Sequence, residues 1–176
     1  MLFKGKYRIK STRLKGYNYG SNGYYYVTIC TKDRCHYFGE IINHKMIYNR
    51  VGYLAIKFWR EIPKHFKYVE MDAFIVMPNH VHGVIRIRGN NAVVETLHCN
   101  ISTKTLFSYV SPKKHSLSVI IRSYKSICSK TINHSFPATN FKWQSLFYDE
   151  IIKNEQHLNN VRKYIKNNPL KWGKDE

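Results

Sequence analysis

The sequence is poor in acidic side chains, with 11 aspartates and glutamates against 29 lysines and arginines in 176 residues. Its formal net charge is therefore +18 at pH 7, and the stretches 1–20 and 96–148 contain no acid at all. A compact chain with this excess repels itself, which favours a polyanionic partner such as nucleic acid. Basic blocks are often only solvated surface, but a total this large favours contacts with phosphates.

Long apolar runs are also missing. No stretch approaches the ~18 apolar residues that a membrane span requires. The first residues, Met1–Lys6, lack the apolar segment of a signal peptide. We therefore expect a cytoplasmic protein without a membrane partner.

Cysteine is scarce and shows no paired C-x-x-C spacing. The four residues are Cys30, Cys35, Cys99 and Cys128. This pattern argues against a structural zinc site or a disulfide-rich secreted scaffold, and it predicts reduced thiols. With 43% hydrophobic residues, the chain can build a core, and its length suits one domain over 1–176. Within that domain we expect a basic N-terminal arm and loop at 1–23 and an irregular insertion at 89–114.

Hydrophobic periodicity predicts alternating strands and helices. The expected elements are a strand at 24–31, a helix at 47–61 closed by Pro63, strands at 69–77 and 80–88, a helix at 116–134, a strand at 142–152, and a helix at 154–168 stopped by Pro169. This order predicts an α+β, ferredoxin-like sandwich, in which helices pack on one face of an antiparallel sheet and a tyrosine-bearing helix ends the chain.

The most informative motif is a His-x-His pair, His80 and His82, at the start of one predicted strand. Alternate side chains of a strand share a face, so both imidazoles project together, with Arg86 and Arg88 further along that side. Two imidazoles beside cations are poor core material but reasonable ligands for a divalent metal that binds a phosphate. Two ordinary surface histidines are the alternative, because a bare His-x-His occurs by chance.

The last predicted helix carries a candidate third group. At about 100° per residue, His157, Tyr164 and Asn168 cluster within roughly 40° of one another beside the apolar stripe. Asn168 offers an oxygen that can complete a site made by two histidines, and His157 is an alternative ligand. Tyr164 is either a packing residue or a nucleophile. The second role requires a metal that polarises the target phosphate, since a phenol is a weak nucleophile near neutral pH.

These residues resemble the HUH single-tyrosine transposases of insertion sequences, and especially their REP-associated tyrosine transposase branch. The similarity runs over most of the chain, and its most specific feature is the His-x-His pair followed, in this order and spacing, by the Tyr164–Pro169 motif. The segments that carry it are Arg13–Tyr17, Tyr26–Thr31, Met77–Gly83, Trp143-Gln144 and Tyr164–Pro169.

The resemblance implies an enzyme that cuts and rejoins single-stranded DNA near hairpins through a 5′-phosphotyrosine, in DNA transposition or the processing of REP elements. It implies that Tyr164 is the catalytic nucleophile and that His80, His82 and Asn168 hold Mg²⁺ or Mn²⁺. The implied partner is single-stranded, hairpin-forming DNA, and the implied oligomeric state is a monomer or a homodimer.

Basic residues are expected to bind the DNA backbone, with Tyr17 and Tyr19 available to stack on unpaired bases. The candidates for phosphate contacts are Arg13, Lys15, Arg86, Arg88, Arg122 and Lys125.

Two other functions stay open. A non-catalytic ferredoxin-like module that binds single-stranded nucleic acid on its sheet explains the charge and the aromatic residues, but not two histidines on one strand face. A metal hydrolase for a small molecule is a weaker alternative, because barrels of that kind need ~250 residues and more His or Asp ligands.

Overall fold

The structure of the protein, a computed structural model, describes residues 17–88 and 116–173. The predicted insertion at 89–114 and most of the predicted arm at 1–23 lie outside these ranges. Within the described ranges, no helix combines the length and the apolar character that crossing a membrane requires.

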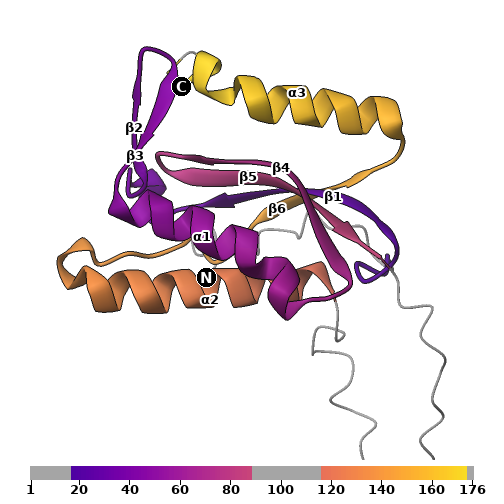
Figure 1. Cartoon of the computed structure of the whole chain (residues 1–176), viewed down its shortest axis with the longest axis horizontal. Helices are drawn as coiled ribbons and strands as arrows, with labels where there is room; N and C mark the ends of the chain where they lie inside the picture. Colours follow the sequence, from indigo (N-terminus) through magenta and orange to yellow (C-terminus); the bar gives the residue numbers. More distant parts are fainter. Residues whose placement is uncertain (1–16, 89–115, 174–176) are drawn as a thin grey trace, which may run out of the picture.

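A four-stranded antiparallel sheet forms the centre of the fold, in the order β4-β5-β1-β6. Its strands are β1 (Gly23–Cys30), β4 (Val69–Met77), β5 (His80–Ile87) and β6 (Tyr148–Ile152). Helices α1 (Arg50–His65) and α2 (Leu117–Ser135) cover one face, and α3 (Glu155–Lys171) lies along the other (Figure 1). This connectivity and strand order confirm the predicted ferredoxin-like sandwich.

The main core lies between the sheet and the helices α1 and α2. Odd-numbered residues of β1, such as Val27 and Ile29, point into it and are fully buried. They meet Trp59 of α1 and Tyr124 of α2, whose rings pack edge to face at 5.2 Å. The strand period of two therefore sends alternate β1 residues toward this pair of helices and the others toward α3.

Helix α3 packs on the opposite face through a separate apolar cluster. Its side chains Leu158, Val161 and Ile165 contact Tyr26 and Val84 of the sheet. A bidentate ion pair adds to this contact: the Arg162 guanidinium donates to both carboxylate oxygens of Asp72 in β4, at 2.9 and 2.6 Å. The tyrosine-bearing helix is thus fixed on the sheet of its own chain.

A short hairpin that the sequence analysis did not predict precedes α1. It consists of β2 (Gly39–Ile42) and β3 (Lys45–Tyr48), joined by Asn43 and His44 with φ of 49° and 61°. Two consecutive positive φ values define a tight hairpin turn, for which Asn-Gly is the usual sequence signal. Here histidine replaces the glycine, so the sequence does not indicate the turn. Ile47, predicted to lie in the helix, is therefore in β3, and α1 begins only after the cap residue Asn49.

The expectation that prolines end two helices is wrong. Helix α1 continues through Pro63 to His65, and α3 continues through Pro169 to Lys171. A proline removes one N–H donor, but later residues still reach carbonyls one turn back, as the Phe66 N–H does to Ile62 at 3.0 Å. The last strand is also shorter than predicted: β6 begins at Tyr148, and Trp143 forms only an isolated bridge with Thr31. The single-turn helices η1 (Lys32–Arg34) and η2 (Pro137–Thr139) complete the described elements.

Candidate active site

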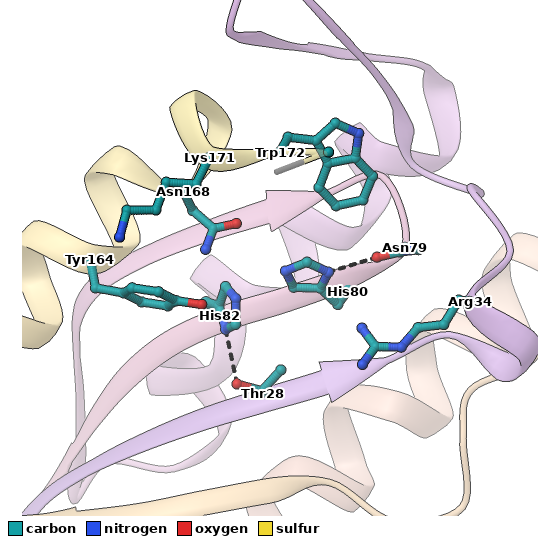
Figure 2. A pocket seen from close by; sticks show the side chains of 10 residues that line it. Thr28, Arg34, Asn79, His80, His82, Tyr164, Asn168, Lys171 and Trp172 are labelled. Carbon is teal, nitrogen blue, oxygen red and sulfur yellow. Dashed lines mark hydrogen bonds between the residues drawn. The ribbon is translucent and has the colours of Figure 1, made fainter. Parts of the chain in front are cut away.

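A pocket of about 470 Å³ opens where β5 begins and α3 ends (Figure 2). Its lining comes from β1, η1, β5 and the last turns of α3. The residues are Thr28, Arg34, Asn79, His80, His82, Tyr164, Asn168, Lys171, Trp172 and Gly173. The structure thus brings together the four residues Tyr164, His80, His82 and Asn168, which the sequence places in two distant segments.

The His80 and His82 side chains form the floor of this pocket. The tight turn at Pro78-Asn79 starts β5, and the strand period then places both imidazoles on the α3 face with ring centroids 4.4 Å apart. Both residues are buried, with 7% and 5% of their surface exposed.

Each imidazole uses its Nδ1 atom for a hydrogen bond inside the protein. His80 Nδ1 donates to Asn79 Oδ1 at 2.7 Å. His82 Nδ1 lies 2.9 Å from Thr28 Oγ1 and 2.7 Å from the hydroxyl of Tyr26. The remaining nitrogen of each ring is Nε2, and partners of this kind at Nδ1 fix the orientation of metal-binding histidines.

Both imidazoles are neutral near pH 7. Burial lowers the pKa of His80 to about 4, with the positive charge of Arg34 adding to the effect and a hydrogen bond with Asn168 opposing it. Burial lowers the pKa of His82 to about 3, aided by His80 and Arg34. Neutral imidazole is the form that coordinates a metal ion, so the pocket keeps its histidines ready to bind at neutral pH.

Helix α3 supplies the other two residues from consecutive turns. The Tyr164 ring meets His82 edge-on at 5.4 Å and Tyr26 at 6.3 Å, with 41% of the residue exposed. Asn168, one turn later, is buried and reaches His80. The phenol of Tyr164 is directed toward His82, and the amide of Asn168 toward both imidazoles (Figure 2). A hydroxyl that can act as a nucleophile therefore lies beside a two-nitrogen, one-oxygen donor set.

This donor set fits a divalent ion with an incomplete protein shell. The described residues contain no group of three His, Cys, Asp or Glu side chains that could hold a metal, so a third protein ligand beside the two imidazoles would have to be of another kind, and the Asn168 amide lies next to them. Two imidazoles and one amide leave several positions of a six-coordinate ion for phosphate oxygens or water, as Mg²⁺ and Mn²⁺ sites do.

Comparison with known proteins places the chain in a family. An uncharacterized protein of Haemophilus influenzae is 34% identical over 176 residues, which span 98% of this chain and 94% of the relative. A solved REP-associated tyrosine transposase bound to a REP hairpin superposes with a TM-score of 0.52 at 20% identity, covering 93% of this chain and 75% of that chain. The chain belongs to the family of the Haemophilus protein and has a transposase-like fold.

Two further comparisons add nothing to this assignment. A solved structure from Deinococcus radiodurans R1 matches 89% of this chain and 97% of its own length, at 17% identity and a TM-score of 0.47. No family model matches the chain.

The sequence does not predict several of the pocket residues. Lys171 places its ammonium 5.9 Å from the Tyr164 ring, and Trp172 stacks on His80 at 6.0 Å. Lys171 lies seven residues after Tyr164 and so on the same helix face, but a helix predicted to stop at 168 concealed it. Arg34 comes from an irregular turn in which it and Asp33 both have positive φ, and no periodic pattern marks such a position.

The predicted DNA contacts lie elsewhere or outside the described ranges. Arg86 and Arg88 form ion pairs with Glu70 at the other end of β5, the first at 3.1 Å. On α2, Arg122 is exposed, whereas Lys125 donates to the carbonyls of Gln144 and Ser145 at 2.5 and 3.1 Å. None of these four lines the pocket.

The remaining predicted residues are Arg13, Lys15 and His157. Arg13 and Lys15 fall outside the described residues. His157, the alternative ligand, lies outside the pocket lining, with Nε2 3.4 Å from Glu150 Oε1 and Nδ1 accepting from the Lys153 N–H at 3.5 Å.

Proposed function

We propose that this chain is a DNA strand transferase that cuts single-stranded DNA near hairpins and rejoins it through a 5′-phosphotyrosine on Tyr164. The observation that carries the proposal is the pocket itself, in which a half-exposed phenol lies beside two buried, neutral imidazoles. The fold likeness to a transposase whose solved structure holds a REP hairpin supports DNA as the partner, in transposition or the processing of REP elements.

The proposed reaction is a transesterification at one phosphodiester. The Tyr164 oxygen attacks the phosphorus in line, the Tyr164 O–P bond forms, and the P–O3′ bond breaks. The phenol loses its proton to water, and the departing 3′ oxygen takes one up to become a 3′-OH. The phosphodiester energy is retained in the phosphotyrosine, so a second 3′-OH can displace Tyr164 and join strands without ATP.

His80, His82 and Asn168 would hold the divalent ion, Mg²⁺ or Mn²⁺. When bound, this ion offsets the negative charge that develops on the non-bridging oxygens of the scissile phosphate. The chain's own residues fix the geometry: Asn79 and Thr28 orient the imidazoles, and α3 sets the distance between Tyr164 and Asn168. All four site residues come from one chain, so a single copy can assemble the site.

The test is a nicking assay on a single-stranded oligonucleotide that contains a hairpin. We expect Tyr164→Phe to lose cleavage by roughly a thousandfold or more, because the nucleophilic oxygen is gone, while hairpin binding is retained. Tyr53→Phe is the matched control, since Tyr53 is exposed on α1, on the other side of the sheet. Chelation by EDTA should abolish nicking, and Mg²⁺ or Mn²⁺ should restore it. An undiminished covalent adduct in Tyr164→Phe would remove Tyr164 from this role, and scission without divalent ions would remove the metal.

A further inference from the structure

The pocket lining carries positive charge and no negative charge. Of its ten residues, Arg34 and Lys171 are cations and none is an acid. The three donors that face a divalent ion, two imidazoles and one amide, are uncharged. Protein sites for Mg²⁺ and Mn²⁺ usually include carboxylates, whose charge compensates that of the ion. Here the compensating charge must come from outside the pocket lining.

Arg34 adds a positive charge close to the proposed metal ligands. Its guanidinium extends from η1 into the pocket beneath His80 (Figure 2). It lies close enough to both histidines for its charge to disfavour their protonated forms. The same charge must repel a dication held by these rings, because Coulomb repulsion does not depend on which positive group occupies the position.

Arg34 has no ion-pair partner among the described residues, and its neighbour Asp33 pairs with Lys32 at 3.9 Å. Arg86 and Arg88, by contrast, share Glu70. Lys171 likewise has only the Tyr164 ring as a described contact. Two cations thus flank the proposed reaction centre and remain able to bind an anion.

A phosphodiester can both compensate the charge of a divalent ion and bind the two cations. Its non-bridging oxygens accept hydrogen bonds from a guanidinium and an ammonium, and its negative charge compensates that of a divalent ion. We propose that Arg34 and Lys171 are phosphate-binding residues of this site, and that the pocket takes up a phosphodiester and a divalent ion cooperatively, each raising the affinity for the other. This inference rests on the proposed function, and it adds two site residues and a mutual dependence of metal binding and phosphate binding.

The experiment measures Mn²⁺ affinity rather than cleavage. Full-length Tyr164→Phe protein, which cannot form the covalent product, is titrated with Mn²⁺ while the EPR signal of the aqueous ion is followed, with and without a short single-stranded oligothymidylate. We expect the oligonucleotide to tighten Mn²⁺ binding about tenfold, within the usual range of coupling between two sites. By reciprocity, Mn²⁺ tightens oligonucleotide binding by the same factor.

Adding Arg34→Gln to this protein changes the two affinities in opposite directions. Mn²⁺ alone should bind a few-fold more tightly, because a nearby positive charge is removed. The oligonucleotide should bind more weakly, and the coupling should shrink. Lys171→Gln should weaken oligonucleotide binding in the same way. Lys130→Gln removes an equal charge from an exposed position of α2, on the opposite layer of the fold, and should leave the affinity for Mn²⁺ alone unchanged.

The outcomes separate this inference from the proposed function. Equal Mn²⁺ affinity with and without the oligonucleotide, or an Arg34→Gln protein with unchanged affinities, overturns the inference even if the wild-type protein nicks DNA. Cooperative binding that depends on Arg34 supports the inference even if no cleavage is found, in which case the proposed strand transfer fails alone.

Discussion

His82 meets two hydroxyl groups at its Nδ1 atom, and the order of these hydrogen bonds decides which nitrogen can bind a metal. Thr28 Oγ1 donates to the Tyr26 oxygen at 3.2 Å and lies 2.9 Å from His82 Nδ1. If Nδ1 carries the imidazole proton and donates it to Thr28, Nε2 keeps its lone pair. Burial raises the pKa of the Tyr26 hydroxyl, so Tyr26 keeps its proton at neutral pH.

Thr28→Val should therefore weaken metal binding without touching a ligand. Without the Thr28 oxygen, the Tyr26 hydroxyl can donate to Nδ1, which moves the imidazole proton to Nε2 and blocks coordination. We expect Mn²⁺ affinity to fall by about tenfold or more, as when other partners of metal-bound histidines are removed. The measurement is a Mn²⁺ titration, with Thr131→Val on α2 as the control. Equal affinities in the two variants would show that Thr28 does not set the tautomer.

The two buried histidines also predict how stability depends on pH. In the unfolded chain both titrate near pH 6.5, whereas the folded pKa values are about 4 and 3. Between about pH 6.5 and pH 4, the unfolded state therefore binds more protons than the folded state. Stability is fully present above about pH 6.5 and falls toward about pH 4, by up to about 1.4 kcal/mol per pH unit for each histidine.

Replacing one histidine should remove its part of this slope. In metal-free buffer, urea unfolding of His82→Gln should show a weaker fall of stability with acid than wild type, by about one proton. His65→Gln, at the exposed end of α1, is the control and should keep the wild-type slope. Parallel pH profiles for wild type and His82→Gln would contradict the assigned burial of this ring.

At the scale of elements, β5 can lie against α1 only because Gly83 has no side chain. A Cβ at Gly83 would lie 2.1 Å from Cζ2 of the buried Trp59 indole. The position of β5 just after the His-x-His pair therefore depends on the close contact between Gly83 and Trp59 of α1. Shifting Trp59 would disturb the ring packing with Phe74 and Tyr124.

Gly83→Ala should destabilise the fold by about 1–3 kcal/mol, the usual cost of overpacking a core. The measurement is the free energy of unfolding in urea, with tryptophan fluorescence as the signal. In Gly173→Ala, nothing lies within 4 Å of the new Cβ, so this variant carries only the cost of a left-handed backbone at φ 77° near the end of α3. A Gly83→Ala protein as stable as wild type would mean that Trp59 moves without loss.

The sequence predicts those parts of the fold that depend on periodicity. The β4–β5 hairpin and α2 follow from regular apolar alternation, and their predicted bounds agree with the structure within a residue or so. The two histidines share a face for the same reason. Irregular backbone defeats this method: the β2–β3 turn and Arg34 depend on positive φ values at residues without a glycine signal.

The sequence also does not predict the ends of α1 and α3, because proline often ends a helix but lies inside both of them here. Helix α3 extends three residues beyond the predicted end, and that extension supplies Lys171 to the pocket. The predicted DNA contacts on β5 lie outside the pocket, and their role as phosphate contacts stays a prediction. Strand alternation identifies a face but not how far along it a residue lies, and Arg86 is four residues beyond His82, or ~13 Å at the usual rise per strand residue.

At the scale of the whole molecule, several described acids pair with arginines that do not line the pocket. On the α3 side of the sheet, Glu70 pairs with Arg86 and Arg88, and Asp72 pairs with Arg162. These contacts compensate arginines that lie along β4 and β5, whereas the pocket lining has two cations and no acid. The chain has a net charge of +18. Part of this charge, on Arg34 and Lys171, lies in the same pocket as the candidate nucleophile Tyr164.

This distribution predicts how DNA binding responds to salt. Each phosphate that the protein neutralises releases counterions, so the affinity for single-stranded DNA should fall steeply, with a log–log slope of about 0.7 per contact. Arg34→Gln should lower that slope by about 0.7, because the guanidinium has no described carboxylate partner to exchange for a phosphate. Arg86→Gln removes the same charge but also frees Glu70 from one of its two arginines, so it should change the slope less. Fluorescence anisotropy of a labelled hairpin oligonucleotide at several salt concentrations measures both slopes. A larger change for Arg86 than for Arg34 would mean that DNA follows β5 to its far end and that charge pairing within the protein does not decide where the backbone binds.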